Sequence, residues 1–198
     1  MKQYYFLFFS LFFFSVSAQN DLENIKKKYG SIKSYNLNYE LIVSMNSTDE
    51  DIIIIKEVGA MYGNNASYII NHKNMDVISD GEKIYNIIHS TKEINIVQYS
   101  DNNLWNPINI FKNFLERINS SLIEYKNDYI HVSFYIEDLE RTYLFFLDKN
   151  YDIFKLVFNT KGNNSKTTIL INNIEFTDKT LNIGFDKSTY EDYYLNFL

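Results

Sequence analysis

The residue types that most often carry out acid–base, nucleophilic or metal chemistry are few in this chain. The three histidines, His72, His89 and His131, stand singly, without the short spacing or the neighbouring acids of a zinc site or a catalytic triad. Cysteine is absent, which excludes thiolate ligands, cysteine nucleophiles and folds held by disulfides. We therefore expect no catalytic residue, no metal site and no cofactor, and we interpret the chain as a protein that is not an enzyme.

The charged residues and the glycines also indicate no site for phosphate or nucleic acid. The acidic pairs Glu50-Asp51 and Glu191-Asp192 fall in polar turns, and the run Lys26–Lys28 is typical of a solvated helix face. The six glycines form no phosphate-binding loop. A net charge of −6 does not favour nucleic acid or an anionic membrane, so we expect neither as a partner.

Apolar residues follow the period of β-strands through the first half of the chain. In Tyr35–Met45 every second residue is apolar, which is the pattern of a half-buried strand. We expect this strand to pair antiparallel with the β-branched segment Ile52–Tyr62, because only a short polar turn separates them. Within Met61–Tyr99, short apolar runs alternate with turn residues such as Asp80-Gly81, a strong hairpin signal. The middle of the chain is therefore predicted to be a β-meander.

Two segments have helical spacing instead. Asp21–Ile32 predicts a short amphipathic helix, and Pro107–Ile118 predicts a second one, with Asn106 as its N-cap and Pro107 in its first turn. Strand-like runs resume after it at Ser121–Lys126, Tyr129–Ile136, Arg141–Leu147, Asp152–Asn159 and Lys166–Phe176. The expected fold class is α+β, mainly β, with about ten or eleven antiparallel strands in one strongly curved sheet or open barrel.

Several predicted strands are apolar on both faces, as in Ile84–Ile88, Leu144–Leu147 and Ile153–Phe158. A sheet with one solvated face would not show this pattern. One interpretation is a closed barrel or sandwich core with a helix over one side. The other is a sheet whose concave face forms a hydrophobic cavity, with the helix Pro107–Ile118 as its lid. The pattern alone leaves both open.

The beginning of the chain has the organisation of a secretory signal peptide. Lys2 is followed by the apolar run Tyr4–Phe14 and by the small residues Val16-Ser17-Ala18, so we expect cleavage after Ala18. The apolar run is shorter than the roughly 20 residues that span a bilayer. We therefore predict a signal peptide over residues 1–18, one mature domain over residues 19–198, and export to the periplasm.

Two segments resemble a known family. The run Val77–Ile87, with Ser79-Asp80-Gly81 at its centre, is similar to the "v-S-D-G-x-x-l-W-x-y" hairpin of the periplasmic lipoprotein carriers, the LolA/LolB-like family. The segment Phe185–Tyr190 resembles the "F-x-f-d-x-x-x-Y/P" ending of that family. The order of the predicted elements also matches over nearly all of the mature chain.

The resemblance implies an incomplete, strongly curved antiparallel barrel of about 10–11 strands with helices at its mouth. It implies a chaperone that binds the acyl chains of lipoproteins in a hydrophobic cavity and carries them from the inner to the outer membrane. Its partners would be an inner-membrane release complex and an outer-membrane acceptor. Because no cysteine is present for lipid attachment, the chain resembles the soluble LolA-type branch and is expected to be a monomer. The alternative is a lipid- or partner-sensing module on the same fold that shuttles nothing.

Two sets of residues are expected at such a site. The predicted cavity lining is Leu37, Tyr39, Leu41, Val43, Tyr68, Ile70, Tyr85, Ile87, Phe134 and Phe146. The predicted lid residues are Ile108, Phe111, Phe114 and Leu115. Where the best-known branch has a Lys-Arg-Pro segment whose arginine fastens the lid, this chain has Tyr62–Ala66, a glycine-asparagine turn. We therefore expect packing alone to hold the lid.

Overall fold

The structure is a computed structural model, and it describes residues 20–45, 51–64, 66–99, 106–115, 123–126, 128–137, 140–160, 162 and 164–198. The predicted signal peptide lies outside these ranges. After a helix over residues 20–31, the elements follow in this order: β1 (Ser34–Met45), β2 (Ile52–Gly63), β3 (Ser67–Asn71), β4 (Met75–Asp80), β5 (Lys83–Ile88), β6 (Glu93–Gln98), α2 (Pro107–Phe114), β7 (Ile123–Tyr125), β8 (Ile130–Ile136), β9 (Arg141–Leu147), β10 (Ile153–Thr160), β11 (Ser165–Thr177), the 3-10 helix η3 (Lys187–Tyr190) and β12 (Tyr194–Phe197).

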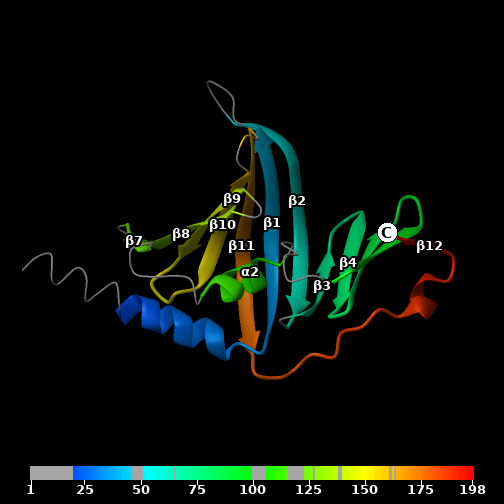
Figure 1. The fold of residues 1–198 in the computed structure, drawn as a ribbon, viewed down its shortest axis with the longest axis horizontal. Helices are drawn as coiled ribbons and strands as arrows, with labels where there is room; N and C mark the ends of the chain where they lie inside the picture. Colours follow the sequence, from blue (N-terminus) through cyan, green and yellow to red (C-terminus); the bar gives the residue numbers. More distant parts are fainter. Residues whose placement is uncertain are drawn as a thin grey trace, which may run out of the picture.

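All the described strands belong to one curved sheet that does not close on itself (Figure 1). The strand order is β12-β6-β5-β4-β3-β2-β1-β11-β10-β9-β8-β7. Each neighbouring pair is antiparallel except β12 with β6, which is parallel. The predicted fold class, mainly β with an incomplete antiparallel barrel, is confirmed. The 12 strands exceed the expected ten or eleven because β12 was not among the predicted strands.

The pairing of the first two strands agrees with the prediction. β1 and β2 are antiparallel, with Leu37 opposite Met61 and Leu41 opposite Glu57. Leu37 and Tyr39 are buried as expected, with 1% and 4% of their surface exposed. Leu41 and Val43 share their face but are only half-buried.

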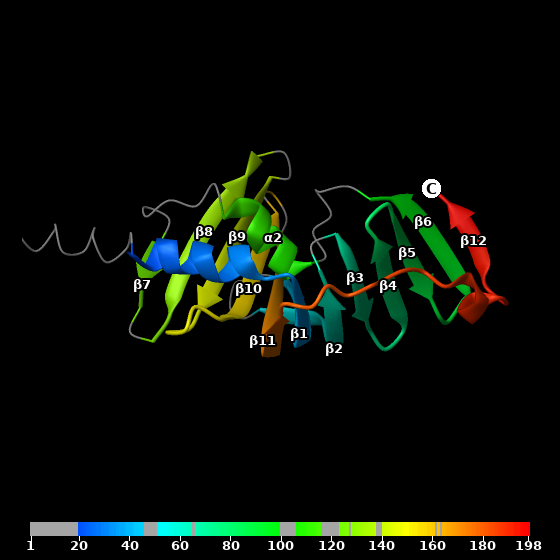
Figure 2. The same cartoon turned by 90° about the horizontal axis from the view of Figure 1, so that it is seen from below.

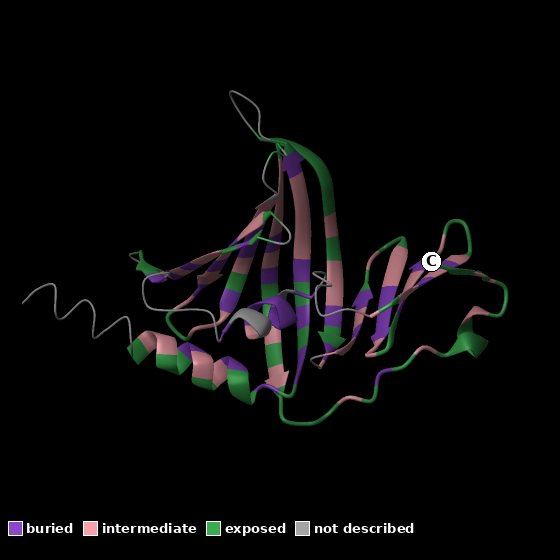
Figure 3. Ribbon diagram, viewed as in Figure 1, coloured by how far each residue is buried: buried purple, intermediate pink, exposed green. Residues whose placement is uncertain are grey.

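The two helices define the faces of the sheet. Both pack against the face that carries Tyr35, Leu37 and Tyr39, which we call the inner face. Figure 2 shows them side by side across β8, β9 and β10. Figure 3 shows buried residues in the lower parts of β1 and β2 and at the upper end of β1, where Ser44 is buried, whereas the upper part of β2 is exposed.

The opposite, outer face of β4–β6 is covered by the end of the chain. After β11 the backbone runs past the ends of the strands to the opposite edge of the sheet, where β12 pairs with β6 (Figures 1 and 2). Leu181, Phe185 and Tyr193 of this C-terminal segment pack against a second apolar cluster that contains Ile78 and Ile87. The sheet therefore has apolar cover on both faces in this half, which explains why its strands are apolar on both sides.

Helix α2 begins as the sequence predicts. The side-chain oxygen of Asn106 accepts hydrogen bonds from the backbone N–H groups of Ile108 and Asn109, both at 3.1 Å, and Pro107 follows the cap. The helix ends at Phe114. Ile118, the predicted end, lies outside the described residues.

Candidate functional site

The inner face is built by strand alternation and by two glycines that let tyrosine residues lie close to β2. A Cβ atom on Gly59 would lie 2.7 Å from the Cζ atom of Tyr39, so the ring lies directly over the backbone of β2. A Cβ atom on Gly63 would lie 2.6 Å from the Cβ atom of Tyr68. These close approaches bring Tyr39 of β1 and Tyr68 of β3 against the backbone of β2, where only glycine leaves room.

The two helices fill the lower part of the inner face. Ile108, Phe111 and Leu115 of the predicted lid are all buried there, as expected. The ring of Phe111 lies between two other rings, 4.8 Å from Tyr29 of the N-terminal helix and 4.7 Å from Phe145 of β9. Edge-on and tilted contacts of this kind stabilise a buried cluster beyond the burial of area. The side chain of Phe114 lies outside the described part of the structure.

Two hydrogen bonds fasten α2, so the expectation that packing alone holds it is wrong. The Asn106 side-chain amide donates to the hydroxyl of Tyr35 on β1. At the other end, the Lys112 amine donates to the backbone carbonyl of Ile32 at 2.8 Å. Burial lowers the pKa of Lys112, so its charge lies in a partly desolvated place. The Tyr35 hydroxyl and the Ile32 carbonyl therefore hold the two ends of α2 to the sheet and to the end of the N-terminal helix.

Most, but not all, of the predicted lining residues share the inner face. Residues that lie opposite each other on neighbouring strands share a face. This register and the clusters place seven of the ten there: Leu37, Tyr39, Leu41, Val43, Tyr68, Ile70 and Phe134. The assignments of Tyr85, Ile87 and Phe146 are wrong.

The three misplaced residues lie on the outer face. The ring of Tyr85 stacks on Phe185 of the C-terminal segment at 4.1 Å, and Ile87 belongs to the same outer cluster. Phe146 is paired with His131 and Lys155, and its ring lies 4.9 Å below the Lys155 amine. Their strands are apolar on both faces, so parity could not be assigned from the sequence. Had the strand register been known, the polar cross-strand partners of Phe146, which are His131 and Lys155, would have indicated that it lies on the outer face.

An aromatic row that was not predicted from the sequence crosses the inner face. Phe134 of β8 lies opposite Tyr143 of β9, which lies opposite Phe158 of β10. Their rings stack, with centroids 5.7 Å apart in the first pair and 5.6 Å in the second. The row continues through Thr167 to Val43 of β1. Phe134 and Phe158 are half-buried, whereas Tyr143 is fully buried. This apolar wall is therefore only partly covered.

Each histidine lies beside a carboxylate, contrary to the expectation that the histidines stand alone. His89 Nε2 is 3.0 Å from an oxygen of Asp76, and His131 Nδ1 is 3.6 Å from an oxygen of Glu124. His72 Nε2 lies 2.8 Å from the Tyr39 hydroxyl. Within the described ranges, no group of three or more histidine or acidic side chains is placed to hold a metal ion.

His72 is the most buried of the three. Only 6% of its side chain is exposed, and its Nδ1 atom is 3.7 Å from a Glu57 oxygen, too far for a hydrogen bond. Burial lowers the pKa of His72 below its ordinary 6.5, although the carboxylates of Glu57 and Asp76 act in the opposite direction. The folded protein therefore favours the neutral imidazole.

This burial predicts a loss of stability in acid. The unfolded chain binds the proton more readily than the folded one, so stability is fully present above the ordinary histidine pKa and is lost as pH falls through the lowered one. His72→Gln should flatten the fall of the unfolding free energy between about pH 8 and about pH 5. Urea unfolding at both pH values measures it. Identical pH dependence in the parent and His72→Gln would contradict this assignment.

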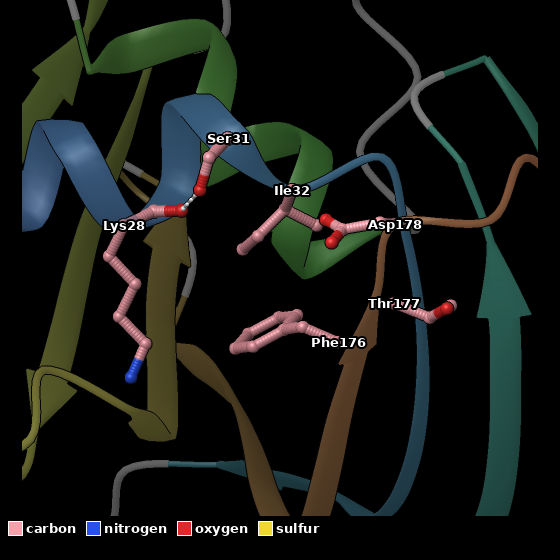
Figure 4. A pocket seen from close by; sticks show the side chains of 6 residues that line it. All are labelled: Lys28, Ser31, Ile32, Phe176, Thr177 and Asp178. Atoms are coloured by element: carbon pink, nitrogen blue, oxygen red, sulfur yellow. Dashed lines mark hydrogen bonds between the residues drawn. The ribbon is translucent and has the colours of Figure 1, made fainter.

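Two small pockets lie beside the N-terminal helix and not beneath α2. One, of about 230 Å³, lies between the end of that helix and the end of β11 and is lined by Lys28, Ser31, Ile32, Phe176, Thr177 and Asp178 (Figure 4). The Lys28 amine lies 5.8 Å from the centre of the Phe176 ring and 2.6 Å from an Asp152 oxygen. A second pocket of about 230 Å³ includes Asp21 and Tyr125. Neither includes a predicted lining residue.

The chain was compared with known proteins. No family model and no curated protein matches it. Among solved structures, an uncharacterized conserved protein from Thermus thermophilus matches with a TM-score of 0.50 and 8% identity, over 92% of this chain and 99% of that one. At this identity, the likeness shows the fold alone.

Two further structures match more loosely. A Vibrio parahaemolyticus domain described as a putative outer membrane lipoprotein-sorting protein domain has a TM-score of 0.41 and 10% identity, over 88% of this chain and 97% of that one. A DUF1329 family protein from Desulfovibrio piger has a TM-score of 0.36 and 11% identity, over 89% and 97%. These scores are too low to carry an argument about function.

In the described part of the chain, no helix is long and apolar enough to cross a membrane.

Proposed function

We propose that this protein is a periplasmic carrier that binds the acyl chains of lipoproteins on the inner face of its sheet. It would take them from a release complex in the inner membrane and deliver them to an acceptor in the outer membrane. In this proposal the protein acts as an exported, soluble monomer and catalyses no reaction.

The observation that carries the proposal is the aromatic row Phe134–Tyr143–Phe158, with Leu41 and Val43 beside it on the inner face. This apolar wall is continuous with the core beneath α2, yet Phe134, Leu41 and Val43 are only half-buried. An acyl chain would lie along the row and, when α2 moves away, would extend over the core that the helix had covered. A contiguous apolar surface that is only partly covered marks a ligand-binding groove or an interaction site.

The energies are consistent with a cargo that can be released. An acyl chain of about 15 methylenes gains about 12 kcal/mol on burial at about 0.8 kcal/mol per methylene. Exposing Ile108, Phe111 and Leu115 costs about 1.5–3 kcal/mol each, or about 5–9 kcal/mol together. The remaining 3–7 kcal/mol corresponds to a dissociation constant between the millimolar range and about 10 µM. Binding of this strength permits transfer to an acceptor.

Two phenylalanines on opposite faces of the sheet test the site. Phe134 and Phe146 are both half-buried, but only Phe134 lies on the inner face. Phe134→Ser should weaken the binding of a fluorescent long-chain fatty acid by about tenfold, because a ring of the wall is lost. Phe146→Ser, the matched control, should leave binding unchanged. Fluorescence titration measures both, with urea unfolding to confirm that each variant is folded.

Two outcomes would contradict the proposal. Equal losses of affinity in the two variants would show that the probe does not occupy the inner face. Native mass spectrometry of the protein from its own cells provides the second test, in which we expect acylated proteins or peptides to be bound. A stable complex with a membrane partner that is unaffected by lipid would favour the sensing module over the carrier.

A further inference from the structure

The strand β2 is much longer than its neighbour β3, and this leaves part of its edge free. β2 pairs with β1 from Ile52 to Gly63, but with β3 only over Ala60–Gly63. Figure 1 shows β3 and β4 beside only the lower part of β2. Among the described residues, the segment Ile52–Gly59 therefore has no partner strand along the edge that faces away from β1. We call this segment the free edge.

The free edge is unusually apolar for an unpaired strand. Ile52, Ile53, Ile54 and Ile55 have between 41% and 61% of their surface exposed, and Val58 has 70%. An unpaired edge offers a row of backbone N–H and C=O groups to any extended chain that meets it. The outermost strands of the sheet, β7 and β12, have only three and four residues, which limits pairing there.

The two charges in the free edge differ in their surroundings. The Lys56 amine already pairs with Glu40 of β1 at 2.9 Å. The Glu57 side chain is 41% exposed, and the His72 imidazole, whose pKa burial lowers, lies 3.7 Å from one of its oxygens. In the part of the chain that the structure describes, no lysine or arginine pairs with Glu57. A chain that adds to this edge would therefore gain from a positive charge opposite Glu57.

A second copy of this chain is poorly suited to the edge. Antiparallel pairing about a two-fold axis perpendicular to the sheet is centred on one residue, which then faces its own copy. Centring on Lys56 or Glu57 sets like charges directly opposite each other, which is destabilising. Centring on Ile55 sets Glu57 against Ile53 of the other copy and leaves the carboxylate without a cation.

We propose that Ile52–Gly59 is a docking edge for an extended, apolar segment of another protein with a lysine or arginine opposite Glu57. The segment adds to the sheet as a further strand beside β2. It ends at the turn between β3 and β4, which contains His72. Main-chain hydrogen bonds supply affinity, and the residue opposite Glu57 supplies preference. This inference goes beyond the proposed carriage of acyl chains, because the docked segment needs no acyl group.

A set of synthetic peptides tests the docking edge on the full chain. The probe alternates valine and threonine and has one central lysine; a second peptide has glutamate at that position. A third repeats the lysine peptide with alternate backbone amides methylated, which removes the donors that pair with a strand. We expect the lysine peptide alone to protect the amides of Ile52–Gly59 from hydrogen exchange.

Variants of Glu57 test the charge. Glu57→Gln should weaken binding of the lysine peptide by about threefold, as expected for an exposed ion pair, and Glu57→Lys should make the glutamate peptide the better ligand. Urea unfolding confirms that both variants are folded. Failure of the lysine peptide to protect the edge, or equal binding of the methylated peptide, would overturn the proposal. Protection of the same amides by self-association without peptide would overturn it in favour of a second copy.

Discussion

Gly63→Ala should lower the free energy of unfolding by about 3 kcal/mol, at the upper end of what overpacking usually costs. The new Cβ atom would lie 2.6 Å from the Cβ atom of Tyr68, 2.8 Å from its Cα atom and 2.7 Å from the Ser67 carbonyl oxygen. None of these atoms can rotate away. β2 and β3 would have to separate where Gly63 faces Tyr68, next to the turn in which Asn64 N–H donates to the Ser67 carbonyl at 2.8 Å.

Gly30→Ala is the matched control. Gly30 lies in the N-terminal helix, and a Cβ atom there would meet nothing within 4 Å. Alanine is a better helix former than glycine by about 1 kcal/mol, so this variant should be as stable as the parent or more stable. Urea unfolding followed by circular dichroism compares the three proteins. Equal stability of Gly63→Ala and the parent would show that the close approach of β2 and β3 is not as described.

Phe111→Ala and Phe145→Ala should have different consequences although both rings are fully buried and touch each other. Phe145 is part of the sheet, so its truncation should cost about 3–5 kcal/mol. Phe111 belongs to α2, which can shift toward the sheet and close part of the cavity, so its truncation should cost only about 2 kcal/mol. This loss weakens only the closed state, in which α2 covers the inner face.

The same argument predicts opposite effects on acyl binding. In Phe111→Ala the open state is more populated, so the fluorescent fatty acid should bind about tenfold more tightly, and the variant should lose only about 2 kcal/mol of stability. Phe145→Ala removes a ring that stacks on Phe134 of the wall, with centroids 5.5 Å apart, and should weaken binding. Urea unfolding and probe titration on the same preparations measure both. If Phe111→Ala lost as much stability as Phe145→Ala and bound the probe with unchanged affinity, α2 would be an ordinary part of the core and not a lid.

The sequence by itself determined the features that depend on near neighbours in the chain. The alternation in Tyr35–Met45 predicted β1 and its buried side, because strand geometry alone sends every second side chain to one face. The turn at Asp80-Gly81 predicted the hairpin of β4 and β5, and Asn106 with Pro107 predicted the start of α2. Each of these signals is local, so each could be interpreted before the tertiary structure was known.

Only the tertiary structure decided the features that join distant segments. Tyr85 and Phe146 were placed on the wrong face because a strand with apolar residues on both faces lacks the contrast that reveals parity. The cover over Tyr85 comes from Phe185, and the tether of α2 joins Asn106 to Tyr35. The free edge exists because β2 continues beyond β3. No local pattern encodes these relations, since each depends on which strands meet, in which register and over what length.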